Sequence, residues 1–196
     1  ITGDMKKEFL LPDPEADKFS LSITERNGII HYTILHSPQE KLPDNLYLIA
    51  HVRGFLLFVQ PIQKGQGAVS LKSIPEGILT LTLLDGNYVP HSERLVFVRQ
   101  NHSTWQLASD KASYGSRLPI SLNIHLSDLS GQPIKGDFSL SITDNYAIRC
   151  DSTADNILSN LLLTSDIKGY IETPGYYFKD NSQRLKACLD NLMITQ

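Results

Sequence analysis

A six-residue segment occurs twice in this chain of 196 residues. Residues 19–24 and 138–143 share the sequence Phe-Ser-Leu-Ser-Ile-Thr, and each copy is followed by an acidic residue, Glu25 or Asp144. Alternating apolar and polar residues suit a half-buried β-strand, because successive side chains point to opposite faces. A strand sequence that is present twice predicts two β-domains of the same kind in tandem. Because such residues are common in strands, coincidence is the alternative explanation.

The first half of the chain reads as short strands separated by turns. Asn27-Gly28 is a strong hairpin signal, and Arg53-Gly54 marks either a second hairpin or a glycine bulge. Strands at this regular spacing predict a β-sandwich over residues 1–100. The expected strands cover residues 19–24, 29–35, 46–52, 55–59, 68–71, 78–84 and 95–98.

The second half, residues 101–196, combines strand and helix patterns. Strands are expected at 105–108, 118–125 and 137–144, and helices at about 152–168 and 181–196. The first helix has a capping-box spelling at Ser152 to Asp155, and it should end near Gly169. The second has apolar residues at helical spacing, namely Leu185, Cys188, Leu189, Leu192 and Met193. We therefore predict a second β-domain, which is incomplete or carries a helical insertion or C-terminal helices.

The amino-acid composition argues against some classes of binding partner and against a membrane-spanning segment. The net charge of −3 argues against nucleic acid, whose phosphate backbone selects basic surfaces. No stretch approaches the roughly 20 apolar residues that span a bilayer. The first residues lack the basic and apolar regions of a signal peptide. An apolar helical pattern runs up to Gln196, so we expect the chain to continue in a longer protein.

Motifs for catalysis or metal binding do not occur in the sequence. His31 and His36 would face opposite sides of one strand, since their separation is odd. Ser116 lacks the Gly-x-Ser-x-Gly context of an exposed nucleophile. Cys150 and Cys188 could form a disulfide, although a buried free thiol is the commoner state for a cysteine on an apolar helix face. We expect no enzyme activity, no cofactor and no metal site.

One aromatic group is the best candidate for a contact surface. Tyr170, Tyr176, Tyr177 and Phe178 surround the turn formers Pro174-Gly175, and tyrosine and phenylalanine are enriched in interface cores. The alternative, which we favour, is that these side chains pack the helices onto a sandwich.

Several segments resemble macroglobulin-like domains. Residues 75–85 with 93–98 resemble the closing strands of one such domain, and residues 120–128 with 138–144 resemble the opening strands of the next. Residues 156–178, with the sequence NILSNLLLTSDIKGYIETPGYYF, are similar to a segment of large envelope proteins of Bacteroidetes-type bacteria. In those proteins macroglobulin-like domains precede a carboxypeptidase-regulatory-like domain and a TonB-dependent receptor plug domain. Residues 189–196 resemble the helix that follows.

The resemblance implies a fold and a location in the cell. It implies a mainly β protein of tandem macroglobulin-like, immunoglobulin-like sandwiches in the cell envelope, in the periplasm or at the outer membrane. The thioester of protease-trapping relatives needs a Cys-Gly-Glu-Gln run, which neither cysteine has, so trapping chemistry is excluded within these residues.

These observations favour a non-catalytic structural and interaction module. Its expected partners are the neighbouring domains of the parent chain, with another envelope protein, a peptide or a glycan as further candidates. A glycan- or peptide-binding sandwich is the alternative function. A hydrolase with an unrecognised site is a third hypothesis, which a pocket joining a histidine, a carboxylate and a hydroxyl would support.

Overall fold

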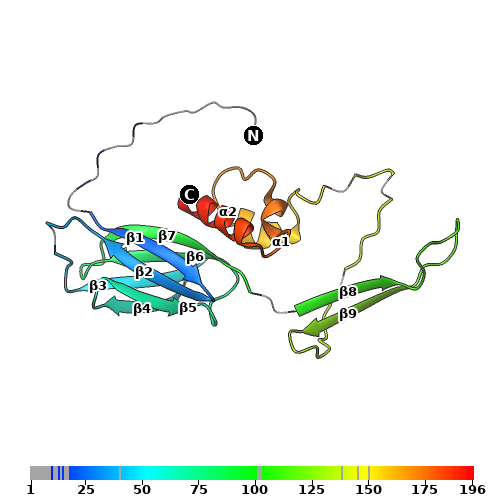
Figure 1. The fold of residues 1–196 in the computed structure, drawn as a ribbon, viewed down its shortest axis with the longest axis horizontal. Helices are drawn as coiled ribbons and strands as arrows, with labels where there is room; N and C mark the ends of the chain where they lie inside the picture. Colours follow the sequence, from blue (N-terminus) through cyan, green and yellow to red (C-terminus); the bar gives the residue numbers. More distant parts are fainter. Residues whose placement is uncertain are drawn as a thin grey trace. The chain divides into compact units, whose positions relative to one another are not determined.

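The computed structural model describes residues 10, 13, 15, 18–39, 41–100, 103–137, 139–144, 146–149 and 151–196. The fold is mainly β, with several antiparallel sheets, as the sequence predicts (Figure 1). The chain divides into two compact units. One contains Ile1–Val98 together with Asp155–Gln196, and the other is Arg99–Ala154.

Two antiparallel sheets enclose the main core of the first unit. The first sheet has the order β1-β2-β5 and the second has the order β4-β3-β6-β7. Burial alternates along β2 and β3, which shows that one side of each strand faces this core. The strands are β1 (Ser20–Arg26), β2 (Ile29–Leu35), β3 (Leu46–Val52), β4 (Phe55–Ile62), β5 (Gln66–Ser70), β6 (Gly77–Leu84) and β7 (Pro90–Val98).

Two hairpins follow from two-residue turns, as expected. Asn27 and Gly28 have φ of 52° and 75°, and Arg53 and Gly54 have φ of 50° and 79°. Positive φ at both central residues is the type I′ geometry, whose twist matches that of the flanking strands. The turns therefore fix the register of β1 on β2 and of β3 on β4.

The last part of the first unit is helical. It comprises α1 (Ile157–Ser159), the π-helical turn η1 (Asn160–Thr164), the 3₁₀ helix η2 (Pro174–Phe178) and α2 (Gln183–Ile194). The sequence predicts the second helix well, but it places the start of the first helix too early and its end, expected near Gly169, too late, because the helical turns stop at Thr164. Asn156 is the N-cap, because its side chain accepts hydrogen bonds from the backbone N–H groups of Leu158 and Ser159.

These helices pack on the first sandwich, whereas the sequence assigned them to the second domain, residues 101–196. They share a core with the outer face of β6 and β7, in which Ile78, Leu163 and Met193 are buried. A sheet face with apolar residues needs cover, and the helical segment supplies it. Residues 155–196 therefore belong structurally to the first unit.

The second unit contains one two-stranded antiparallel ribbon within its described residues. It is formed by β8 (Ser103–Ser109) and β9 (Leu122–Asp128). The strand predicted at 137–144 does not form: residues 137 and 139–144 are outside any strand, and Leu140 and Ile142 are 57% and 76% exposed. Phe138 lies outside the described residues. None of the described strands pairs with this segment, and a strand needs a partner for its backbone hydrogen bonds.

Candidate functional site

A second apolar core joins the helical segment to the sandwich. Ile78 on β6 is paired with Phe97 on β7, and both side chains belong to this core on the outer face of the sheet. Phe97 meets Phe178 of η2 edge to face, with ring centroids 5.8 Å apart and an interplanar angle of 81°. Leu163 of η1 is fully buried here. The sheet face is thus already occupied by the chain's own helices.

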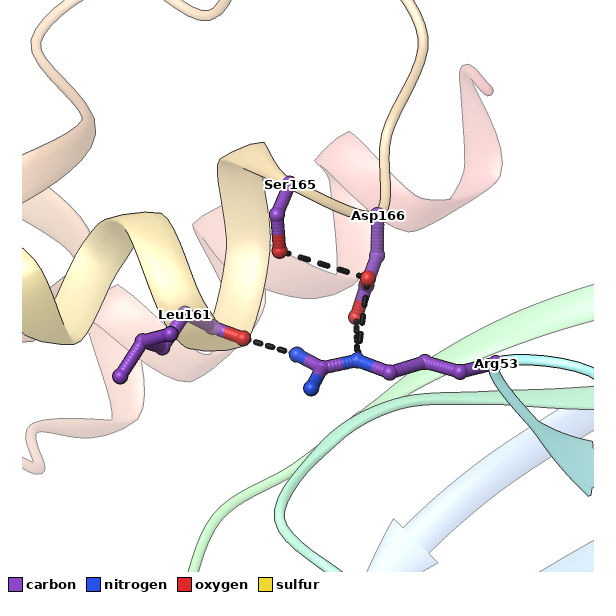
Figure 2. Close-up of polar contacts among 4 residues, drawn as sticks. All are labelled: Arg53, Leu161, Ser165 and Asp166. Atoms are coloured by element: carbon purple, nitrogen blue, oxygen red, sulfur yellow. Dashed lines mark hydrogen bonds and ion pairs between the residues drawn. The ribbon is translucent and has the colours of Figure 1, made fainter.

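An arginine at the β3–β4 hairpin holds the helical segment at one point (Figure 2). The Arg53 Nε donates to both carboxylate oxygens of Asp166, at 3.1 Å to Oδ1 and 2.9 Å to Oδ2. The Arg53 Nη2 donates to the backbone carbonyl of Leu161. A cation beside the last turn of a helix satisfies carbonyls that lack intrahelical donors and suits the negative end of the dipole. Arg53 is the first residue of the two-residue turn between β3 and β4, where its φ is positive. Its side chain therefore leaves from the tip of the hairpin and reaches η1.

A second ion pair ties α2 to β7. The Arg94 Nη2 lies 2.6 Å from Asp190 Oδ1, and the arginine side chain is only 11% exposed. Together with Arg53–Asp166, this contact links the helical segment to strands far away in the sequence. Both pairs keep one partner half-exposed, so each contributes modestly to stability.

Hydroxyl and amide groups around Asp155 form a polar network at the start of α1. Ser159, which is fully buried, donates its hydroxyl to Asp155 Oδ1 at 2.5 Å. Asn160 and Thr164 donate to Oδ2 at 3.4 and 3.2 Å. These hydrogen bonds, that of Ser159 first, hold the pKa of Asp155 below its ordinary value. These hydrogen bonds stabilise the first turn of α1, where Asn156 and Ser159 form a reciprocal capping box.

The predicted aromatic group is divided between core and surface. Phe178 and Tyr177 pack against the second core, and burial raises the pKa of Tyr177. Tyr176 lies edge to face with Tyr177, at a centroid distance of 5.7 Å, and Lys179 lies over its ring. Tyr170 stands apart and is 91% exposed. The role of the four residues as a contact surface stays a prediction; of the four only Tyr170 is exposed, whereas Tyr176, Tyr177 and Phe178 are half-buried.

The β8–β9 ribbon presents an apolar face that the sequence did not single out. Trp105 is paired with Leu126 and Leu107 with Ile124, so these four side chains lie on one side. Trp105, Leu107 and Ile124 are 60%, 65% and 43% exposed. Strands were expected at 105–108 and 118–125, but which residues share a face depends on the register. Alternation of apolar and polar residues in both segments was the available signal.

Groups that could perform chemistry are dispersed. Within the described residues no three histidine, cysteine, aspartate or glutamate side chains cluster as metal ligands. His91 Nε2 lies 3.3 Å from Asp85 Oδ2, and hydrogen bonds from the backbone N–H groups of Val89 and Asn87 help to lower the pKa of Asp85. Cys188 is a half-buried free thiol on α2, whereas Cys150 lies outside the described residues. In the described part of the chain, no helix is both long and apolar enough to cross a membrane.

Comparisons with known proteins give no family. No protein-family model matches the sequence, and no curated protein matches it either.

Proposed function

We propose that the chain is a non-catalytic structural and interaction module of a larger cell-envelope protein with TonB-dependent receptor architecture. The resemblance of residues 156–178 to such envelope proteins supports the location, in the periplasm or at the outer membrane. In this role the first sandwich is a spacer and the second unit a docking surface. Neighbouring domains of the parent chain are the first partners to consider.

The strand order supports an immunoglobulin-like identity for the first sandwich. The third, sixth and seventh strands are neighbours in one sheet, and the first, second and fifth strands form the other. This is the arrangement of the immunoglobulin family, except that the fourth strand lies beside the third. A second domain of the same kind in residues 99–154 would need strands beyond the ribbon.

The interaction role rests on one observation, which is that the two units differ in how far they bury their apolar side chains. The sandwich closes its core, with Leu48, Leu79 and Leu81 fully buried. The ribbon instead leaves Leu107 65% and Ile124 43% exposed. A two-stranded ribbon is at best marginally stable alone, and exposed apolar faces mark interaction sites.

The test places an epitope tag on the natural gene and follows the parent protein through cell fractionation. We expect it in the envelope fraction. Photo-cross-linking from position 107 in those cells should join the ribbon to a protein surface, either in the parent chain or in another envelope protein. The control position is Gln106, which projects from the opposite side of β8. Recovery in the cytoplasm, or equal cross-linking from both positions, would contradict the proposal.

A glycan- or peptide-binding function is the second candidate. It is favoured by Tyr170, an aromatic residue that is 91% exposed. Aromatic faces with polar neighbours suit sugar rings and peptide side chains. Calorimetric titration with defined oligosaccharides and with peptides should give binding that Tyr170→Ala abolishes. Tyr177→Phe, which keeps the packed ring, is the matched control.

A further inference from the structure

The apolar face of the ribbon combines several exposed side chains with an absence of charge. Positions 103–109 and 122–127 contain no lysine, arginine, aspartate or glutamate. On the apolar side Trp105 and Leu107 lie opposite Leu126 and Ile124, and on the other side Gln106 lies opposite His125. Burial of the apolar side therefore removes no charged group from water.

The acidic residue that ends β9, Asp128, is engaged locally. Asp128 Oδ1 accepts hydrogen bonds from the Ser130 backbone N–H at 2.9 Å, the Ser130 hydroxyl at 2.6 Å and the Gln132 backbone N–H at 2.9 Å. This carboxylate is held in its own loop. The second unit as a whole also carries no net charge, because residues 99–154 include five basic and five acidic residues. Two copies of it would not repel each other at long range.

The exposed area is close to the minimum for a specific contact. With 60% of Trp105, 65% of Leu107 and 43% of Ile124 exposed, the face offers about 350 Å² of apolar surface. Two such faces together would bury about 700 Å² of apolar surface. Since about 65% of a homodimer interface is apolar, the whole contact would bury on the order of 1,000 Å², which is the lower bound for a biological interface.

We propose that the ribbon docks face to face with the ribbon of a second copy of this chain. The proposal rests on the interaction role given above and names its partner. A two-fold axis places the same patch on both sides, so an apolar, uncharged face is complementary to itself. Two ribbons stacked about 10 Å apart form a two-layer sheet, and each layer covers the face of the other. A contact of this size gives a weak dimer with a dissociation constant in roughly the micromolar range.

Sedimentation velocity of the whole chain over about 1–300 µM tests the proposal. We expect the dimer fraction to rise with concentration. Leu107→Asp should remain monomeric throughout, because it places a charge in the contact. Gln106→Asp adds the same charge on the opposite side and should dimerise like the unaltered chain. Trp105 is the chain's only tryptophan, so a blue shift of its emission on dimerisation should report burial of this face.

A cysteine experiment covers the possibility that Leu107→Asp disturbs the ribbon itself. In a background in which Cys150 and Cys188 are replaced by serine, Leu107→Cys should form disulfide-linked dimers on mild oxidation, and Gln106→Cys should not. A chain that is monomeric at every concentration would overturn the proposal. A dimer that persists in Leu107→Asp, or cross-links equally from both positions, would overturn it as well. Either result leaves the envelope location and the cross-linking of the parent protein to be decided separately.

Discussion

Leu21→Ala and Leu140→Ala are matched substitutions, because both leucines occupy the same place in the repeated segment. Leu21 on β1 is 5% exposed and packs in the sandwich core, whereas Leu140 is 57% exposed. Truncation of Leu21 removes three carbon groups at about 0.8 kcal/mol each and leaves a cavity, which together predict a loss of about 3 kcal/mol. Leu140→Ala should change the free energy of unfolding by less than about 0.5 kcal/mol.

Urea unfolding followed by far-ultraviolet circular dichroism measures this difference. For a slope of about 2 kcal/mol per molar urea, the predicted loss moves the midpoint of the Leu21→Ala variant by about 1.5 M. In a thermal scan, the same loss corresponds to roughly 10 °C for a body of this size. Hydrogen exchange at β2 gives a local check, since Leu21 is paired with Ile34.

The two variants also supply the refuting result. Equal destabilisation by both would mean that residues 139–144 are packed somewhere, against the exposure found for Leu140. An inert Leu21→Ala would mean that β1 contributes nothing to the core. Either result would show that the two copies of the segment do not differ in burial as described above.

Three further predictions concern the helical segment. Leu163→Ala should lower stability by about 3 kcal/mol and Leu161→Ala by less than about 1 kcal/mol in calorimetry, because Leu163 is fully buried and Leu161 is 53% exposed. Arg53→Ala should cost about 1 kcal/mol and speed hydrogen exchange in residues 155–196, with an effect that shrinks at high salt, since the Arg53 side chain is 46% exposed. Asp155 has a pKa lowered in the folded state, first by the Ser159 hydroxyl, so its contribution is present above the ordinary carboxyl pKa and is lost as the pH falls through the folded value. Asp155→Asn should therefore flatten the pH dependence of the melting temperature below about pH 4, and an unchanged profile would contradict this assignment.

Local signals in the sequence account for the parts of the fold that were predicted well. The strands at 29–35 and 46–52 have the bounds of β2 and β3 in the structure. Their hairpins depend on two adjacent turn residues each, and α2 depends on apolar residues within two or three helical turns. These determinants lie within a few residues of the element that they form, so one sequence is sufficient to find them.

Long-range partners account for the parts that were missed. The helical segment follows the second unit in the chain, and proximity in sequence suggested that it would pack there. It instead packs on β6 and β7, more than 50 residues earlier, through apolar contacts and Arg94, and Arg53 ties it to the β3–β4 hairpin. Neither arginine is distinguishable in the sequence from an ordinary surface residue. The apolar face of the ribbon was missed for a similar reason, because it exists only once β8 and β9 are in register.

The repeated segment shows that a strand sequence does not determine its own burial. After the first copy, the Glu25 carboxylate accepts a hydrogen bond from Gly28, and the chain turns directly into β2, which pairs along the whole of β1. After the second copy, the Asp144 carboxylate accepts a hydrogen bond from Tyr146, but no described strand follows to pair with it. Leu21 is therefore buried and Ile23 half-buried, whereas their counterparts Leu140 and Ile142 are exposed. Since the residues themselves are identical, the difference must come from the missing neighbour. An apolar surface that is exposed because it lacks a neighbour can be covered by another molecule, and this is the physical basis of the interaction role that we propose for the second unit.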